Sequence, residues 1–379
     1  MRRLLVPVLL AGLAAGIAAA PTAHSDDVGE AARAGQWQLG ALRLPEAWRS
    51  SRGEGVLVAV LDTGVNGHHP DLAGAVVQGP DLTGAGRGLW GPHGTAMASL
   101  IAGRGHGDGH RGGVLGVAPA ARVLSVRVTL ENGDPLRQKH RSGWGDALAK
   151  GIRYAADRGA DVISMSLGGG SGAWEGSASE EEAVQYAIGK GAVLVASSGN
   201  DGAAGNRKNF PAAYPGVIAV GAVDRRMKVA GFSNRQDYLS VVAPGAEIVT
   251  ADGDASYVVG DGTSSAAAMV AGVAALIRSA HPDLSPYHVR MAIELGARRR
   301  PEDGYSPAYG HGVVDALLAL READRLDVPV PGAARPGPYF GDGPAPGSRM
   351  PVVAGMLLLV VVMSARVVVR HRGREGDST

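Results

Sequence analysis

Between about residues 36 and 325, mainly apolar runs alternate with glycine-rich turns and amphipathic stretches. The clearest apolar runs are residues 56–61, 122–128, 160–166, 192–196 and 217–220. The helix-like stretches between them are residues 96–102, 143–158 and 180–190. Unbroken runs rich in β-branched residues are typical of strands that are buried on both faces of a parallel sheet. The alternation therefore predicts an α/β fold of three layers, with a mainly parallel sheet between helices.

Composition excludes several other classes of protein. Hydrophobic residues make up 45% of the chain and charged residues 19%, which excludes disorder along its whole length. The 37 basic and 36 acidic residues give a net charge of +1, which argues against a nucleic-acid partner. Cysteine is absent, so disulfides, thiolate metal sites and cysteine nucleophiles are excluded together.

The first 25 residues have the pattern of a secretory signal peptide. A basic start, Met1-Arg2-Arg3, precedes an apolar run over residues 4–20. Cleavage after Ala20 and cleavage nearer Ser25 both fit the sequence, and an N-terminal membrane anchor is the alternative reading. Residues 26–35 then form a short N-terminal extension.

The C-terminal part predicts a tether to a membrane. After a domain that covers residues 36–327, residues 328–350 are dense in Pro and Gly, which is typical of a linker. Residues 351–369 are apolar and near the ~20 residues that a bilayer requires, so we expect a transmembrane helix. The tail, residues 370–379, contains three arginines and is expected in the cytoplasm, with the domain outside. A buried core helix is the alternative for residues 351–369.

Polar residues follow several of the predicted strands. Asp62 follows the first strand, Ser166-Leu167-Gly168-Gly169 follows the third, and Asn200 lies just after the fourth. Ligands of parallel sheets bind at the carboxyl ends of the strands. We therefore expect these residues to converge at one edge of the sheet.

Three short motifs, in the chain order Asp62, His93, Ser264, carry residue types suited to nucleophilic catalysis. Ser264 opens a helix-like run, where free N–H groups and the helix dipole suit a developing oxyanion. The pKa range of histidine suits removal of the serine proton near neutral pH. An aspartate at a strand end can orient that imidazole. Each residue alone would more often be a helix cap or a turn residue, so the prediction depends on the three together.

These motifs, Asp62-Thr63-Gly64, His93-Gly94-Thr95 and residues 262–266 (Gly-Thr-Ser-Ser-Ala), resemble those of the subtilisin-like serine proteases, the subtilases of peptidase family S8. The resemblance covers residues 36–316. It implies that Ser264 is the nucleophile, His93 the general base and then acid, and Asp62 the residue that orients His93.

The same resemblance assigns further roles. Asn200 would be the oxyanion-hole asparagine, beside the backbone N–H of Ser264. Ser166, Leu167, Gly168 and Gly169 would form the edge strand that pairs with an extended peptide substrate.

Two departures from the family pattern are visible. Ala268 stands where the family usually has proline, four residues after the nucleophile. The N-terminal extension is too short to fold as a prodomain, so we expect no activation by prodomain removal. The resemblance also makes calcium binding possible, but we assign no ligands, and no cofactor or metal site is predicted. We interpret His106 and His110 as solvated loop residues.

A subtilase with a short N-terminal extension, a Pro-rich linker and one C-terminal transmembrane helix resembles the mycosins, membrane-bound proteases of type VII secretion. The resemblance implies an extracytoplasmic, single-pass serine endopeptidase that cleaves protein or peptide substrates and is associated with the secretion complex. The alternative hypothesis is a mainly structural subunit of a secretion membrane complex, in which protease activity is secondary.

Overall fold

The computed structural model describes residues 25–86, 90–139, 144–168 and 176–326. Most of the predicted signal peptide, residue 327, the linker, the predicted transmembrane helix and the tail lie outside the described residues. Gly169, one of the predicted substrate-binding residues, also lies outside them.

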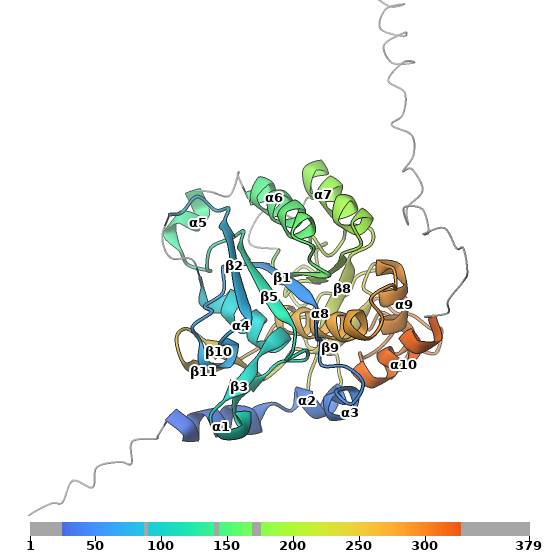
Figure 1. Cartoon of the computed structure of the whole chain (residues 1–379). Helices are drawn as coiled ribbons and strands as arrows, with labels where there is room; N and C mark the ends of the chain where they lie inside the picture. The colour runs from blue at the N-terminus through green and yellow to red at the C-terminus, as the bar shows by residue number, and fades with distance from the viewer. Residues whose placement is uncertain (1–24, 87–89, 140–143, 169–175, 327–379) are drawn as a thin grey trace, which may run out of the picture.

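A parallel sheet forms the centre of the described part (Figure 1). Its strands are β1 (Leu57–Asp62), β2 (Val76–Asp81), β5 (Arg122–Arg127), β6 (Val162–Met165), β7 (Val193–Ser197), β8 (Ile218–Val223) and β9 (Val241–Pro244). They are arranged in the order β2-β5-β1-β6-β7-β8-β9, and each neighbouring pair runs parallel. The chain places β5 and β2 on one side of β1 and the later strands on the other, so the order reverses at β1.

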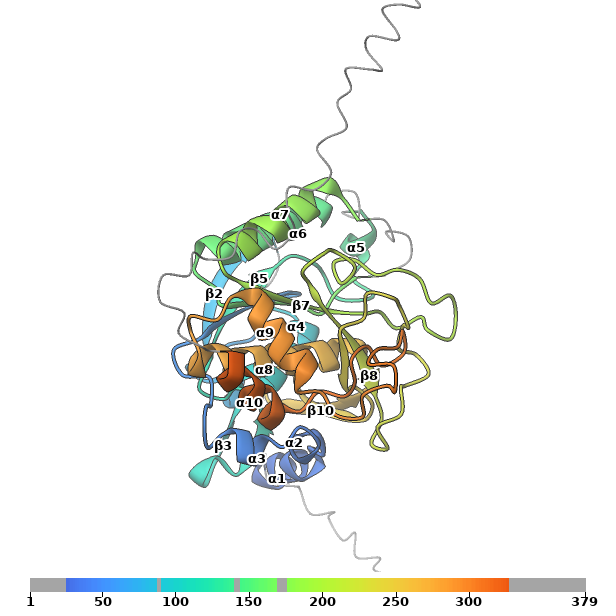
Figure 2. The ribbon, with the colours of Figure 1, turned by 90° about the vertical axis from the view of Figure 1, so that its right-hand side faces the viewer.

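Helices cover both faces of the sheet (Figures 1 and 2). The main ones are α4 (Pro92–Ala102), α6 (Trp144–Asp157), α7 (Ala178–Gly189), α8 (Thr263–Ala280), α9 (Pro286–Leu295) and α10 (Ala316–Leu326). Alternate residues of β1 face opposite layers, as the strand period of two requires. Val58 and Val60 belong to the core beneath α4 and α8, whereas Ala59 and Leu61 belong to the core beneath α6 and α7. The predicted three-layer α/β fold is confirmed.

The five strands and the three helices expected between them are all present, with ends shifted by up to four residues, and the helix-like run that Ser264 opens is α8. The largest shift is at α4, which begins at Pro92 instead of residue 96. Strands β2 and β9 were not predicted. β9 has four residues and β2 is partly exposed with a mixed composition, so neither gives a long apolar run.

Two small antiparallel units flank the main sheet. β3 (Arg104–His106) pairs with β4 (Gly112–Leu115), and β10 (Ile248–Asp252) forms a hairpin with β11 (Ser256–Gly260). Figure 1 shows β10 and β11 beside α4.

The predicted N-terminal extension forms most of helix α1 (Ser25–Gly35), which packs on β4. Arg33 fixes this contact, because its guanidinium donates to the carbonyl oxygens of Gly113 (2.9 Å) and Gly112 (3.1 Å). Ala32 of α1 is buried against Val114 and Val249. Two short helices, α2 (Gln38–Ala41) and α3 (Leu44–Ala47), then lead into β1.

The expectation for His106 was wrong. Its Nδ1 lies 2.6 Å from Oδ1 of the fully buried Asp71, and its side chain is only 23% exposed. The hydroxyl of Tyr257 lies 3.3 Å from the same nitrogen. His110, by contrast, is exposed as expected. Sequence did not reveal the pairing because Asp71 and Tyr257 are 35 and 151 residues away from His106.

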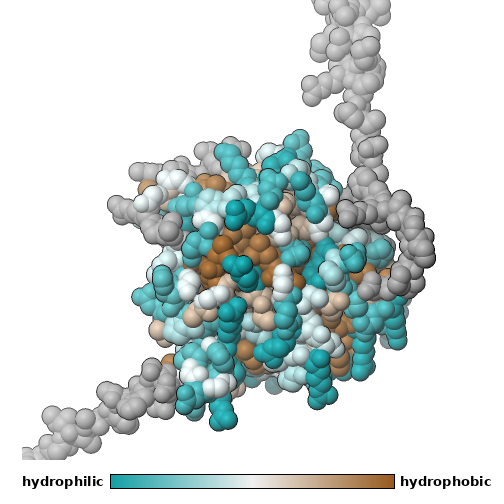
Figure 3. Space-filling model, viewed as in Figure 1, coloured by the Kyte–Doolittle hydropathy of each residue, from teal (hydrophilic) through white to brown (hydrophobic). Residues whose placement is uncertain are grey.

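Within the described part of the chain, α8 is the one helix that is long and apolar enough to cross a membrane. Of its 18 residues, 83% are buried, so α8 is the central core helix of this domain. The face shown in Figure 3 is mainly hydrophilic, around a smaller central area of hydrophobic residues.

Candidate active site

A cleft of about 600 Å³ lies at the carboxyl ends of the central strands, next to the position where the strand order reverses. This is where ligands bind in open α/β sheets. The cleft is lined by Asp62, His93, Ser166, Leu167, Gly168, Asn200 and Ser264, together with residues that the sequence analysis did not single out. All the predicted site residues that the structure describes therefore meet in one cleft.

Asp62 ends β1 and holds the imidazole of His93. Its Oδ1 lies 2.7 Å from Nδ1 of His93 and also accepts the backbone N–H of Thr63 at 2.7 Å. Its Oδ2 is buried and has no hydrogen-bond partner among the described residues. The carboxylate is 1% exposed and the His93 side chain 35% exposed, so the imidazole extends from a buried anchor into the cleft.

The charges around His93 raise its pKa above the usual 6.5. Burial acts in the opposite direction, because a desolvated imidazolium is disfavoured. The negative charge of Asp62, its hydrogen bond and the negative charge of Glu131 outweigh that effect, although the positive charge of Arg137 reduces the rise. A base held by a buried carboxylate in this way is suited to accept a proton during a reaction.

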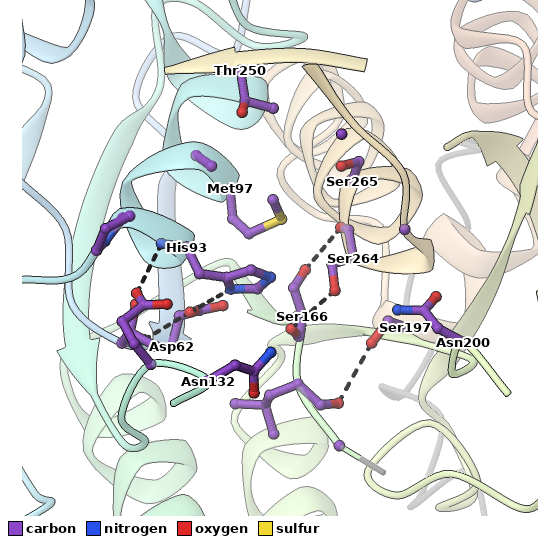
Figure 4. A pocket seen from close by; sticks show the side chains of 18 of the residues that line it. Asp62, His93, Met97, Asn132, Ser166, Ser197, Asn200, Thr250, Ser264 and Ser265 are labelled. Atoms are coloured by element: carbon purple, nitrogen blue, oxygen red, sulfur yellow. Dashed lines mark hydrogen bonds and ion pairs between the residues drawn. The ribbon is translucent and has the colours of Figure 1, made fainter. Parts of the chain in front are cut away.

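Ser264 lies at the start of α8 on the other side of the His93 ring (Figure 4). In this structure its Oγ donates to the carbonyl oxygen of Ser166 at 3.3 Å, and Oγ of Ser166 donates to the carbonyl oxygen of Ser264 at 2.9 Å. Among the described contacts of Ser264 there is no hydrogen bond to His93. The Ser264 hydroxyl must therefore exchange its hydrogen bond to Ser166 for one to the imidazole before it can give its proton to His93.

Asn200 points its amide group toward the start of α8. Its Oδ1 accepts from the backbone N–H (2.9 Å) and the hydroxyl (2.8 Å) of Thr263, which orients Nδ2 away from those donors. A Cβ placed on Gly262 would lie 3.7 Å from the backbone nitrogen of Ser264 and 3.8 Å from Nδ2 of Asn200. Two N–H donors thus flank one small space beside Ser264, which is the arrangement that stabilises an oxyanion.

Ser166, Leu167 and Gly168 extend from β6 along the cleft. Ser166 is buried, Leu167 is half-buried and Gly168 is exposed, with a φ of +130°. A Cβ on Gly168 would approach the carbonyl oxygen of Phe210 to 2.5 Å, so glycine is required at this position. The carbonyl oxygens of Ser166 and Leu167 accept the hydroxyl groups of Ser264 (3.3 Å) and Ser197 (3.4 Å), so the backbone of this segment lies along the cleft.

Two further side chains, for which the sequence predicted no such role, hold the backbone next to His93. Glu131 accepts the backbone N–H of His93 through Oε1 at 2.9 Å, and Oγ1 of Thr63 accepts the N–H of Gly94 at 3.0 Å. Glu131 comes four residues after the end of β5. Polar residues that follow the other strands were used to predict the site, and the same criterion applied to the end of β5 would have identified Glu131.

The described residues contain no group of three or more His, Asp or Glu side chains that could hold a metal ion. We therefore assign no metal ligands.

Comparison with known proteins agrees with this geometry. Residues 53–312 match the family model described as "Subtilase family" (Peptidase_S8). Thermitase of Thermoactinomyces vulgaris is 39% identical over 286 residues, which cover 74% of this chain and 94% of thermitase.

Two solved structures are also similar. The structure of MycP1 from Mycobacterium smegmatis has a TM-score of 0.66 and 28% identity, and the match covers 85% of this chain and 90% of that one. A second MycP1 structure is described as that of a serine protease and essential component of the type VII (ESX-1) secretion system. Its TM-score is 0.63 and its identity 32%, over 75% of this chain and 88% of that one. With the matching fold and cleft, these similarities establish that the chain belongs to the subtilase family and is a subtilisin-like serine endopeptidase.

Proposed function

We propose that Asp62, His93 and Ser264 are the catalytic triad of this endopeptidase. The observation that carries the proposal is the 2.7 Å contact between Asp62 Oδ1 and His93 Nδ1, in the same cleft as Ser264 and Asn200. His93 would take the proton of the Ser264 hydroxyl as that oxygen attacks the peptide carbonyl carbon. The resulting imidazolium would then give the proton to the leaving amine, and water would hydrolyse the acyl-enzyme through the same steps.

The oxyanion of each tetrahedral intermediate would be bound by Nδ2 of Asn200 and the backbone N–H of Ser264. Support comes from the fixed orientation of Asn200, whose Oδ1 is held by two donors of Thr263. The peptide substrate would lie extended beside Ser166, Leu167, Gly168 and Gly169. An incoming backbone N–H that takes the carbonyl oxygen of Ser166 would also free the Ser264 hydroxyl for rotation toward His93.

A fluorophosphonate probe tests the triad, because it reacts with an activated serine and needs no knowledge of the natural substrate. We expect the purified full-length chain to be labelled and Ser264→Ala to be unlabelled. Ser279→Ala is the matched control, since Ser279 lies at the opposite end of α8 and bonds to the carbonyl oxygen of Glu54. A folded wild-type chain that is not labelled, or labelling retained in Ser264→Ala, would contradict the proposal.

We further propose that the enzyme is a mycosin-like protease, secreted by a signal peptide over residues 1–25 and anchored by residues 351–369 with the catalytic domain outside. The apolar composition of residues 351–369 and the arginines that follow support this topology. The similarity to two MycP1 structures supports a place in type VII secretion. Deletion of residues 351–379 should release the enzyme from the membrane fraction into the medium. Retention of the truncated chain in membranes would contradict the C-terminal anchor.

A mainly structural role in a secretion complex is the second candidate. It is favoured by the description of one similar MycP1 structure as an essential component of its secretion system. Secretion measured in cells that carry Ser264→Ala separates the two. Loss of substrate cleavage with unchanged secretion would support the structural role, whereas loss of both would support the catalytic one.

A further inference from the structure

Glu131 contacts the backbone of His93 from outside the predicted triad. It lies in the segment after β5 and lines the cleft, and its Oε1 accepts the N–H of His93 at 2.9 Å. His93 is the second residue of α4, so this N–H has no partner within the helix. The carboxylate therefore caps the positive end of the helix that carries the imidazole.

The approach of this carboxylate depends on Gly91. A Cβ at position 91 would lie 2.4 Å from Oε1 of Glu131 and 2.5 Å from Oγ1 of Thr63. Both of these oxygens accept N–H groups of the first turn of α4, those of His93 and Gly94. The first turn of the helix is thus held on two sides by side chains from neighbouring strand ends.

Three charged groups act on the His93 imidazole from the elements packed around it. Asp62 belongs to β1, Glu131 follows β5, and Arg137 belongs to α5 (Pro135–Lys139). Burial lowers the pKa of His93, the two carboxylates raise it, Arg137 lowers it, and the net direction is upward. Nη1 of Arg137 donates to the carbonyl oxygen of Leu130 at 2.8 Å, so Arg137 is tied to the same segment as Glu131.

We propose that Glu131 is a positioning residue of the active site, which fixes the backbone of His93 and adds a second negative charge beside its imidazolium. This inference rests on the proposed role of His93 as the general base. As His93 takes the proton of Ser264, positive charge develops on the ring, and Glu131 stabilises it together with Asp62. The same charge makes the resting base easier to protonate, so it reduces activity at acidic pH.

Glu131→Gln separates the charge from the hydrogen bond, because the amide oxygen can still accept the N–H of His93. The pKa of His93 should fall, so the acidic limb of the pH–rate profile should move to lower pH. One pH unit below the wild-type midpoint, activity relative to the plateau should rise about twofold to fivefold. The plateau rate should fall by a similar factor, since the imidazolium of the transition state loses part of its stabilisation. Glu131→Ala should move the limb in the same direction and lower the plateau further.

The readout is the second-order rate of fluorophosphonate labelling of the full-length chain, measured against pH. Glu54→Gln is the matched control, because it removes one carboxylate near the amino end of β1, at the opposite edge of the sheet from the cleft. Its pH profile should match the wild type. An acidic limb that stays in place in Glu131→Gln, with an unchanged plateau, would show that Glu131 is only a structural cap and would overturn the proposal.

A second measurement does not depend on catalysis. In NMR titrations with labelled histidine, the His93 signal is assigned by its loss in His93→Ala. Its midpoint should be lower in Glu131→Gln than in wild type, whether or not the protein cleaves peptides. If labelling fails in wild type but the midpoint moves, the proposed function fails and the charge effect stands. An unmoved midpoint overturns the charge effect itself.

Discussion

Asp62→Asn tests the electrostatic part of the mechanism with little change in shape. Oδ1 of Asp62 makes both described hydrogen bonds of the carboxylate, to Thr63 N and His93 Nδ1, while Oδ2 is buried without a described partner. An amide oxygen can keep both bonds, with its NH₂ group in the place of Oδ2. The substitution should therefore remove the negative charge and preserve the orientation of the imidazole.

The size of the effect follows from the geometry. With a nitrogen–oxygen distance of 2.7 Å, the charge centres of the imidazolium and carboxylate lie about 4 Å apart. The His93 side chain is 35% exposed, so an effective dielectric constant of about 20 is appropriate and gives about 4 kcal/mol. This interaction is absent while His93 is neutral. Loss of this attraction in Asp62→Asn therefore destabilises only the transition state, in which His93 becomes charged. Acylation of Ser264 should slow about 10³-fold, with little change in apparent substrate affinity.

Fluorophosphonate labelling and peptide hydrolysis at the pH plateau measure that loss, and thermal unfolding is the control. Because the amide NH₂ group takes the buried place of Oδ2, which has no described partner, Tm should fall modestly, and the assays are run below the Tm of the variant. A loss smaller than tenfold would refute the assumed role of the Asp62 charge. A loss as large as that of Ser264→Ala would refute the assumed amide orientation, since a reversed amide would force His93 into the wrong tautomer.

Three further predictions follow from contacts in the structure. Asn200→Ala removes one oxyanion donor, so in peptide hydrolysis it should lower kcat about 10²-fold to 10³-fold and leave KM almost unchanged. A change confined to KM would contradict this role. Gly113→Ala should destabilise the chain by about 3 kcal/mol or more in urea unfolding, because its φ is +73° and the new Cβ would lie 1.9 Å from Oδ1 of the buried Asp71. Since the pKa of His93 is raised on folding, its imidazolium stabilises the fold below the unfolded pKa and ceases to do so as pH rises through the folded pKa. The wild type should therefore lose stability relative to His93→Gln over that pH range, and parallel stability curves would contradict the pairing.

The parts of the fold that were predicted correctly are those with long, buried, apolar elements. β1 lies between two helical layers, so both of its faces are apolar and its sequence reads as one continuous run. β2 has intermediate or exposed residues throughout, and β11 exposes Val259 to 62%, so neither carries that signal. A continuous apolar run in the sequence identifies a strand that is buried on both faces. It does not identify strands such as β2 and β11, whose residues are partly or largely exposed.

The convergence of the site was predictable for a topological reason. Parallel strands end at the same edge of the sheet, so the sequence alone predicts that Asp62, Ser166 and Asn200 meet. The side-chain rotamer of Ser264 was not predictable in this way. Its hydrogen bond to the Ser166 carbonyl depends on the local distance between α8 and the segment after β6, which sequence spacing does not encode.

Glu131 and His106 show which contacts could not be predicted from the sequence. Each belongs to a carboxylate–histidine pair whose members are 35 or more positions apart, Glu131 with His93 and Asp71 with His106. In each pair a glycine makes room for the carboxylate, Gly91 for Glu131 and Gly113 for Asp71. In the sequence these glycines are not distinguishable from the other residues of glycine-rich turns. Each carboxylate also accepts a backbone N–H group, that of His93 for Glu131 and that of Val114 for Asp71, and a backbone donor leaves no signature in the sequence. The position of Glu131 just after β5 is visible in the sequence, but its contact with His93 comes from the three-dimensional structure. The pH profile of Glu131→Gln is the direct measure of what its charge contributes at His93.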